Sequence, residues 1–154
     1  MSTTEEITRV LNAFGLHTDT HRWDKLLALF APEVTVDYTS LFGGSVQATR
    51  AADLVAAWKK LIPQFTCAQH LITNHLIDVD GDSAFAETQV AALHTMVEPA
   101  LAGKDAWTVG GRYEFKLRKL GGAWKIEAVK LIATRQSGNF GIMKIAQERA
   151  AAVR

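Results

Sequence analysis

The sequence lacks most of the features that mark specialised classes of protein. Its 154 residues contain one cysteine, Cys67, so an internal disulfide is impossible and a reducing compartment is compatible. Seventeen Lys and Arg against sixteen Asp and Glu leave a net charge of +1, with no basic stripe for nucleic acid. No apolar run approaches the roughly 18 residues that a membrane-spanning helix needs. We therefore expect one cytoplasmic globular domain over 1–154, with neither nucleic acid nor membrane as a partner.

Motifs for bound cofactors and for nucleophilic catalysis are also missing. No two histidines have the H-x-x-x-H spacing and no C-x-x-C occurs, so we expect no metal site. There is no G-x-G-x-x-G, no P-loop and no G-x-S-x-G, which gives nucleotide cofactors and serine hydrolysis no support. Cys67 has no sequence neighbour that would lower its pKa and make it a nucleophile. We expect any chemistry to proceed without a cofactor.

The first sixty residues show helical periodicity. Thr3–Glu6 has the spacing of a capping box, and apolar residues then recur on one helical face at Ile7, Val10, Leu11 and Phe14. A second helix is predicted over 23–30 and a short strand over 34–38. A third helix is predicted after a cap at Thr49.

From Phe65 onward the period of the apolar residues changes from about 3.6 to 2, which is typical of strands. Four antiparallel strands are predicted, over 70–79, 84–96, 109–120 and 123–134. A short helix over 142–153 ends the chain. Helices followed by long antiparallel strands indicate an α+β fold, with its core over about 4–135.

Alternation along these strands predicts which side chains face the interior. The inward face of the third strand comprises Val109, Gly111, Tyr113, Phe115 and Leu117. That of the first comprises His70, Ile72, Asn74 and Leu76, with His75 opposite. The second strand carries mostly small residues on the face that includes Val90 and His94, and small residues on a concave face leave room for a ligand. We expect a pocket lined by Ile72, Asn74, Val90, Tyr113 and Phe115.

An aspartate and a histidine are candidates for an acid/base pair in this pocket. Asp19 ends the first helix beside its buried stripe, and His70 lies on the concave face. A carboxylate that binds an imidazole fixes its tautomer and raises its basicity. Spacing leaves other roles open, because Asp19 could cap the second helix, and His70, His94 and Tyr38 could be structural.

Several segments together resemble the SnoaL-like branch of the nuclear transport factor 2-like superfamily, over about residues 4–135. They are the stretch 21–38 (HRWDKLLALFAPEVTVDY), Gln69-His70, and the runs 110–113 (GGRY) and 121–126 (GGAWKI). The resemblance implies a cone-shaped α+β barrel. In it a strongly curved, mixed or antiparallel sheet wraps around three N-terminal helices, a pocket opens at its mouth, and a C-terminal helix follows.

The resemblance also assigns roles to individual residues. In dehydratase and dehydrochlorinase members, an aspartate at the end of the first helix pairs with a histidine at the start of a long strand, which matches Asp19 and His70. The dehydratase pattern adds a tyrosine after the second helix and a second histidine, which match Tyr38 and His94. Its other tyrosine is replaced by Thr18, so the grip on the substrate differs.

These residues predict a lyase that eliminates a small group from a small, apolar, cyclic or aromatic substrate, with Asp19, His70, Tyr38 and His94 as catalytic residues. A cofactor-free isomerase would use the same base, and a non-catalytic ligand-binding or assembly module would use the fold alone. We expect a homodimer across the outer face of the sheet, with a trimer as the alternative. The apolar side of the last helix, with Ile142, Ile145 and Ala146, is a candidate for docking on a neighbour.

Overall fold

Helices come first along the chain and long strands follow, as predicted. The computed structural model describes Met1–Arg154. Its helices are α1 (Thr3–Asp19), α2 (Trp23–Leu27), α3 (Thr39–Phe42), α4 (Ala51–Leu61) and α5 (Gly141–Ala152), with short 3-10 turns at Ile62–Gln64 and Pro99–Leu101. Its strands are β1 (Phe30–Asp37), β2 (Gln47–Arg50), β3 (Cys67–Asp80), β4 (Ser83–Thr95), β5 (Ala106–Leu120) and β6 (Ala123–Gly138). No helix has both the length and the apolar character needed to cross a membrane.

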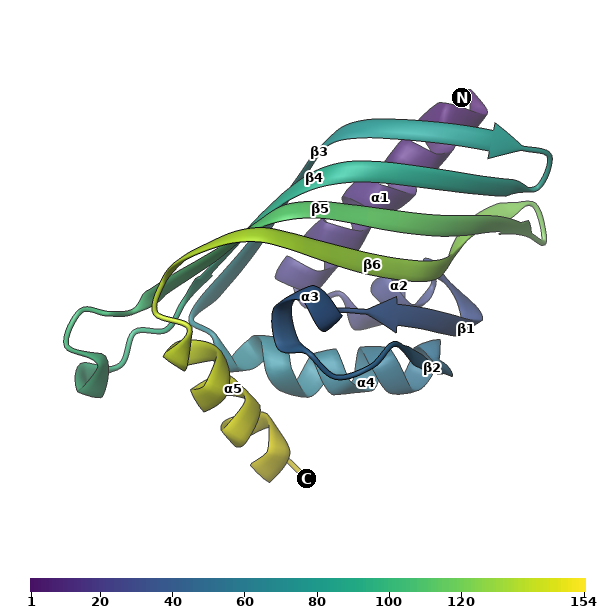
Figure 1. The fold of residues 1–154 in the computed structure, drawn as a ribbon. Coiled ribbons are helices and arrows are strands. Elements are labelled where there is room, and N and C mark those ends of the chain that lie inside the picture. Colours follow the sequence, from purple (N-terminus) through teal and green to yellow (C-terminus); the bar gives the residue numbers. More distant parts are fainter.

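All six strands form one curved mixed sheet in the order β2-β1-β6-β5-β4-β3. The pair β1–β6 is parallel, and every other neighbouring pair is antiparallel. The helix α1 crosses the sheet behind β3–β6, while α4 and α5 lie below its other end (Figure 1). The predicted α+β architecture of a curved sheet around N-terminal helices is confirmed.

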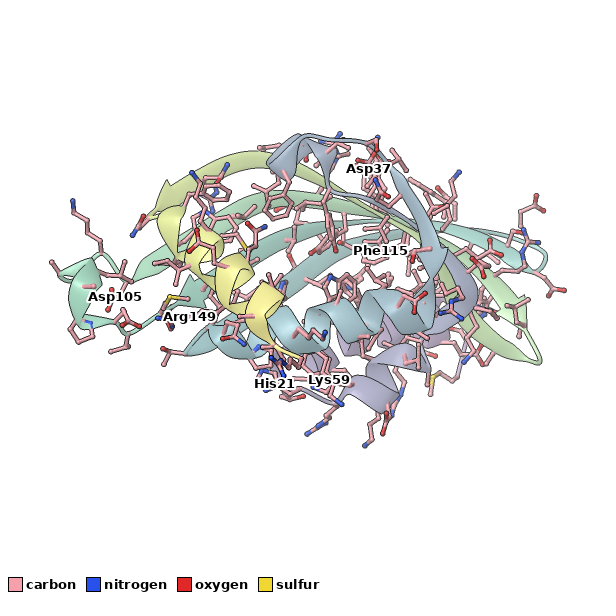
Figure 2. The ribbon with its side chains drawn as sticks, turned by 90° about the horizontal axis from the view of Figure 1, so that it is seen from below. His21, Asp37, Lys59, Asp105, Phe115 and Arg149 are labelled. Carbon is pink, nitrogen blue, oxygen red and sulfur yellow. The ribbon has the colours of Figure 1, made fainter.

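The helices α4 and α5 close one side of the molecule, as the view from below shows (Figure 2). In this view Arg149 lies on α5, and Asp105 lies on the loop between β4 and β5 that projects beyond it. An ion pair of 2.9 Å between Arg149 and Glu98 ties the helix to the base of that loop. The C-terminal helix is therefore held against the rest of the chain.

Local boundaries at the N-terminal half differ from the prediction. The capping box is formed one residue earlier, by Ser2 and Glu5, with the Ser2 N–H donating to the Glu5 carboxylate at 2.6 Å. The second helix ends at Leu27, because the chain already enters β1 at Phe30. Thr49 lies in β2, a four-residue strand that was not predicted, and the N-cap position of α4 is the next residue.

A β-bulge in β3 reverses the predicted alternation. The register with β4 shifts between Thr73 and Leu76, and Asn74 has a φ of +55°. Asn is one of the few residues other than Gly that adopts this left-handed backbone readily. The extra residue turns His75 inward and leaves Leu76 69 % exposed. The prediction that Asn74 and Leu76 share the inward face of His70 is therefore wrong.

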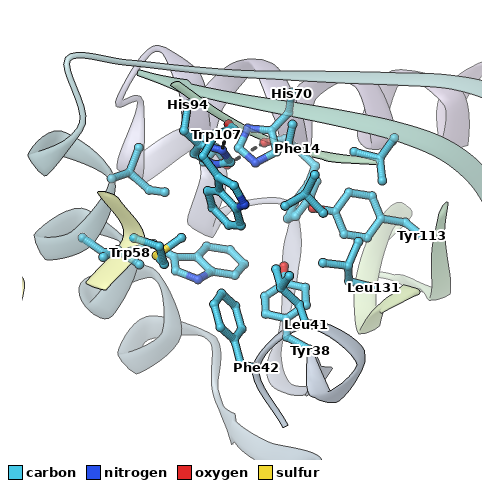
Figure 3. A pocket seen from close by; sticks show the side chains of 17 residues that line it. Phe14, Tyr38, Leu41, Phe42, Trp58, His70, His94, Trp107, Tyr113 and Leu131 are labelled. Atoms are coloured by element: carbon cyan, nitrogen blue, oxygen red, sulfur yellow. Dashed lines mark hydrogen bonds between the residues drawn. The ribbon is translucent and has the colours of Figure 1, made fainter. Parts of the chain in front are cut away.

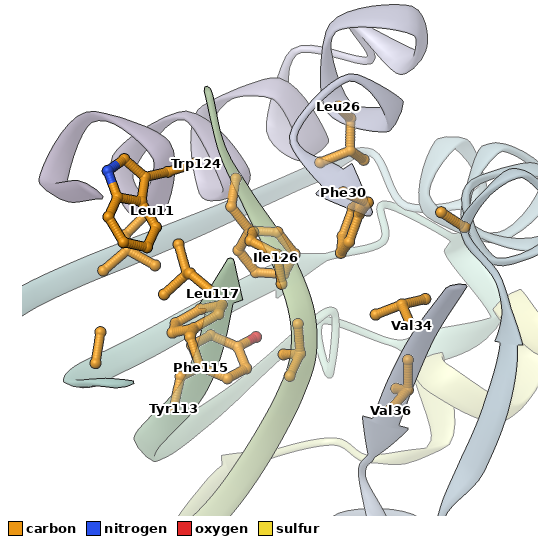
Figure 4. Close-up of a cluster of buried hydrophobic side chains, with 14 of the residues drawn as sticks. Leu11, Leu26, Phe30, Val34, Val36, Tyr113, Phe115, Leu117, Trp124 and Ile126 are labelled. Atoms are coloured by element: carbon orange, nitrogen blue, oxygen red, sulfur yellow. The ribbon is translucent and has the colours of Figure 1, made fainter. Parts of the chain in front are cut away.

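Two apolar clusters fill the interior. The larger contains 20 buried residues and packs α1 and α2 against the sheet around Phe115, Leu117 and Ile126 (Figure 4). The smaller cluster comprises Phe65, Met96, Trp107, Val109, Ile142, Met143 and Ala146. Since Ile142 and Ala146 are fully buried in it, they fix α5 to its own chain. The expectation that these residues dock on a neighbour is wrong.

Candidate active site

One mainly apolar cavity opens between the sheet and the helices α3, α4 and α5 (Figure 3). Seventeen residues line it, fourteen of them hydrophobic, and its aromatic lining comprises Phe14, Tyr38, Phe42, Trp58, Trp107 and Tyr113. Its volume of about 120 Å³ is close to the roughly 150 Å³ of an engineered protein cavity that binds benzene. The cavity therefore has room for a compact group of about one ring.

The cavity exists because small residues face one another across β4 and β5. Val90 pairs with Gly111, and Ala92 pairs with Val109. At Gly111 a side chain would collide with the carbonyl of Ile132, so only glycine fits. On either side of this stretch the pairs carry an aromatic ring on β5: Thr88–Tyr113 and His94–Trp107. The hollow is thus bounded by Tyr113 at one end and Trp107 at the other.

Asp19 binds His70 through both of its carboxylate oxygens. Oδ1 lies 2.6 Å from the ring Nδ1, and Oδ2 accepts the backbone N–H of His70 at 2.7 Å. Both side chains are about 12–13 % exposed. Asp19 lies one turn after Gly15, where an added Cβ would be 3.3 Å from the His70 carbonyl oxygen. This close approach of α1 to β3 brings the carboxylate to the imidazole.

The partners of His70 determine which of its ring nitrogens is free. A carboxylate only accepts hydrogen bonds, so the contact with Asp19 assigns a proton to Nδ1. Nε2 is then the unprotonated nitrogen of the neutral ring, and His70 is one of the residues that line the cavity. Asp19 does not cap the second helix, because the N-cap position of α2 is Arg22.

His94 is the second imidazole of the cavity and is 5 % exposed. Its ring centroid lies 5.8 Å from that of His70, edge to face, and 4.7 Å from that of Trp107, stacked. Burial, with the neighbouring His70 as a smaller cause, lowers the pKa of His94 to about 4, so the ring is neutral near pH 7. Nδ1 lies 3.3 Å from the Trp107 carbonyl oxygen, which only accepts, so Nε2 is again unprotonated.

Two phenols, one partly buried and one fully buried, face the cavity from the opposite end. Tyr38 follows β1 and begins α3, and Tyr113 lies on β5. Burial raises the pKa of both hydroxyls, and the Tyr113 phenol raises that of Tyr38 further. Both tyrosines therefore remain protonated at any physiological pH and can donate hydrogen bonds.

The other polar groups of the lining are already engaged. The Thr18 hydroxyl donates to the Phe14 carbonyl at 2.8 Å, and the Trp107 indole donates to Gln136 at 3.0 Å. The cavity therefore offers a ligand two acceptors, the Nε2 atoms of the imidazoles, and phenol donors at the other end. No Lys or Arg lines it, and no group of three or more His, Cys, Asp or Glu side chains could hold a metal ion.

The structure brings most of the predicted site residues together. His70, His94, Tyr38, Val90 and Tyr113 line the cavity, and Asp19 supports His70 from behind. Three predicted pocket residues lie elsewhere. The structure places Asn74 on the exposed side of the β-bulge, Ile72 against Gly15 and Phe115 in the larger core cluster.

Sequence reasoning misplaced one residue of the lining and missed others. The sequence alone puts Trp107 in a loop, from which it could roof a pocket; it does line the cavity, but from β5, two residues before the predicted start of that strand at 109. Met143 belongs to α5, whose apolar face was interpreted as a docking surface. The helical spacing of Trp58 places its side chain inward, but nothing in that spacing separates a cavity wall from a core.

A curved mixed sheet that encloses a pocket with its own helices defines an α+β cone. The chain belongs to the SnoaL-like domain family, which matches residues 1–130. The resemblance noted from the sequence is confirmed.

Individual relatives agree with this assignment. Dehydratase cfoI of Aspergillus candidus is 33 % identical over 119 residues, which cover 70 % of this chain and 68 % of that protein. The crystal structure of Kfla4162 from Kribbella flavida has a TM-score of 0.85 at 25 % identity, covering 92 % of this chain and 96 % of that one. The hexachlorocyclohexane dehydrochlorinase LinA-type3 of Novosphingobium barchaimii LL02 has a TM-score of 0.70 at 16 % identity, covering 90 % and 91 %. The last of these shares the fold alone.

Proposed function

We propose that this protein is a cofactor-independent lyase that eliminates water or a similar small group from a ring substrate. The observation that carries the proposal is the 2.6 Å contact between Asp19 and the Nδ1 atom of His70, at the wall of an apolar cavity. At the level of the family, a dehydratase among the relatives supports a lyase-type function. An imidazole held in this way is a general base whose free nitrogen is available to a substrate.

The first step is removal of a proton from carbon. The substrate presents a C–H bond next to a carbonyl group to the Nε2 atom of His70, which takes the proton. The carboxylate of Asp19 stabilises the imidazolium that forms. Negative charge develops on the carbonyl oxygen, and the phenols of Tyr38 and Tyr113 are the hydrogen-bond donors that stabilise it.

The second step expels the leaving group. The C–O bond of the neighbouring hydroxyl breaks, a carbon–carbon double bond forms, and the imidazolium of His70 returns its proton to the departing oxygen as water. Because the pKa of His94 is about 4, this ring is neutral and accepts a hydrogen bond from the substrate hydroxyl. His94 is thus a binding group, and His70 serves as both base and acid.

The shape and charge of the cavity set the substrate class. About 120 Å³ accommodates a compact group of about one ring, and aromatic walls favour a flat or cyclic, mainly apolar molecule. The lining carries no cationic side chain, so nothing would offset the charge of a carboxylate or phosphate. We propose a neutral cyclic ketone with a hydroxyl group on the β-carbon.

Single-ring β-hydroxy ketones test the proposal directly, since loss of water creates a conjugated enone that absorbs in the ultraviolet. Replacing the base in His70→Gln should lower the rate by about 10²- to 10⁴-fold. Asp19→Asn should lower it as well, because the ring loses the acceptor that fixes its tautomer. The matched control is His75→Gln, five residues along the same strand and outside the cavity lining, which should change the rate little. Undiminished turnover in His70→Gln would reject the mechanism.

Isomerisation is the second candidate, favoured by the two phenols that face the cavity opposite the base. Donors in that position stabilise an enolate, and the proton would then return to a different carbon. Mass spectrometry of the product separates the two reactions. An isomer has the mass of its substrate, whereas dehydration removes one water.

We also propose that the protein forms a homodimer through the outer face of β3 and β4. Leu71 and Leu93 point away from the cavity and are 47 % and 37 % exposed, and Ala91 pairs with Leu71. An exposed apolar strip of this kind is typical of a contact between subunits. Light scattering should give a dimer mass that falls to the monomer in Leu93→Lys. A trimer mass would favour a trimer over the proposed dimer, and a monomer mass would reject both assemblies.

A further inference from the structure

Trp107 contacts His94 in two different ways. Its carbonyl oxygen lies 3.3 Å from Nδ1 of the imidazole, and its indole stacks on the imidazole with centroids 4.7 Å apart and an interplanar angle of 28°. Phe65 also packs against the imidazole, at a centroid distance of 4.9 Å. His94 is therefore held by aromatic rings and by one backbone oxygen, with no carboxylate partner of its own.

The indole of Trp107 is itself anchored from outside the cavity. Its only donor, Nε1–H, binds the side-chain oxygen of Gln136 on β6 at 3.0 Å. Gln136 is exposed, and it pairs with Val109, two residues along β5 from Trp107. The indole is 99 % buried and cannot turn about its side-chain bonds without leaving this donor unpaired. The exposed side-chain amide of Gln136 thus fixes the orientation of the indole ring on which His94 stacks.

We propose that Gln136 is a positioning residue of the site. By anchoring the Trp107 indole, it holds His94 in one orientation and one tautomer, with Nδ1 protonated toward the Trp107 carbonyl and Nε2 free for the ligand. This inference rests on the proposed function in one respect, namely that His94 accepts a hydrogen bond from the substrate hydroxyl. Gln136 is not one of the residues that line the cavity, and it acts on His94 through Trp107 alone.

The surroundings of His94 explain why its state depends on this anchor. The titratable groups that act on it are His70 on β3 and, more weakly, Asp19 on α1. Its other close ring neighbours, Phe65 and Trp107, carry no charge. Burial is the largest cause of its lowered pKa, so a loosened indole that admits water should raise that pKa toward its ordinary value.

Nuclear magnetic resonance of protein with ¹⁵N-labelled histidine and tryptophan tests the inference without a substrate. Gln136→Met keeps the length of the side chain and removes the acceptor. We expect the pKa of His94 to rise by roughly one pH unit, its Nδ1–H tautomer signal to become a mixture, and the Trp107 indole signal to lose its hydrogen-bonded shift. The matched control Gln136→Glu keeps an acceptor oxygen and should retain the single tautomer.

A second variant removes the same hydrogen bond from its other end. Trp107→Phe keeps an aromatic face and the backbone carbonyl but has no indole N–H, so it should change the His94 tautomer as Gln136→Met does. The double variant should change it no further than either single variant. An unaltered His94 titration and a single tautomer in Gln136→Met or Trp107→Phe would overturn the inference. If the variants titrate as expected but the native protein shows no elimination activity, the proposed function is rejected and the positioning role of Gln136 stands.

Discussion

The inner face of the sheet has a packed half and a hollow half, and the same two strands build both. In the packed half a small residue on β4 faces a large one on β5, as in the pairs Ala84–Leu117 and Ala86–Phe115. In the hollow half small residues face small ones, at Val90–Gly111 and Ala92–Val109. The backbone pairing and the direction of the side chains are alike in both halves, so on these two strands the core and the cavity differ in side-chain size.

The two halves also differ in how their polar groups are treated. Phe115, Leu117 and Ile126 are at most 1 % exposed, and the larger core cluster to which they belong includes no charged residue. The hollow half places His70, His94 and two tyrosines around a small apolar space. We therefore expect stability to depend more on the packed half and chemistry on the hollow half, and substitutions matched across the two halves can test this division.

The largest expected effect is on stability, from truncation in the packed half. Phe115→Ala removes a fully buried ring and leaves a cavity in the core, so it should lower the free energy of unfolding by about 3–5 kcal/mol. The matched change Phe42→Ala, at the cavity wall where the ring is 44 % exposed, should cost about 1 kcal/mol or less. Urea denaturation measures both. Equal losses would show that the wall of the cavity contributes to stability as the core does.

Acid should act on the hollow half through His94. Its pKa is about 4 in the folded protein and about 6.5 in the unfolded chain, so the unfolded chain binds the extra proton at intermediate pH. The contribution of the neutral ring is complete above pH 6.5 and is lost as the pH falls toward 4, by on the order of 3 kcal/mol in total. Burial lowers the pKa of His17 and His75 as well, with the same sign.

Urea titrations at pH 7.5 and pH 4.5 measure this loss. Other groups also titrate in that range, so the informative quantity is the difference between the native protein and His94→Gln. The variant should lose less stability between the two pH values. A loss of the same size in both proteins would mean that His94 makes no net contribution to the acid sensitivity.

The smallest effect comes from one substitution made at two places on the same strand face. Ala86→Leu adds three carbon atoms where no space exists and should cost about 1–3 kcal/mol. Ala92→Leu places the same atoms in the cavity and should cost less than about 1 kcal/mol, while it abolishes ligand binding. Thermal unfolding measures the stability of both variants, and ligand titration measures their binding. A large loss of stability in Ala92→Leu would contradict the hollow described here.

The regular parts of the sheet could be predicted from the sequence because alternation is a local property. It placed Val90, His94 and Tyr113 inward, where the unbroken β4–β5 ladder keeps them. Alternation failed at Asn74 and His75, because the bulge needs one residue with a left-handed backbone conformation. Asn adopts that conformation readily, but its presence in a sequence does not require it. The cap was displaced for a related reason, since Ser2-x-x-Glu5 and Thr3-x-x-Glu6 both match the motif and only packing chooses between them.

The site could be predicted only in part, because its contacts are tertiary. Helical spacing brought Asp19 to the buried side of α1, yet its contact with His70, 51 residues away, also needs the close approach at Gly15. Trp107 lies just before the stretch that periodicity identified, so neither its place in β5 nor its contact with His94 had a local signal. The cavity itself follows from residue sizes on two paired strands, which becomes visible once their register is known.

The double attachment of Asp19 has a consequence for how related sequences are interpreted. His70 lies on β3, the edge strand of the sheet, and its N–H would otherwise be an unpaired donor at that edge. The carboxylate that supports the imidazole therefore also closes the rim of the sheet. A descendant that lost its reaction would still gain from keeping Asp19, because the folded chain needs that acceptor. Retention of the aspartate–histidine pair in a relative thus indicates that the edge of the sheet is intact. An active enzyme is recognised instead by the free imidazole nitrogen, the phenols and the cavity between them.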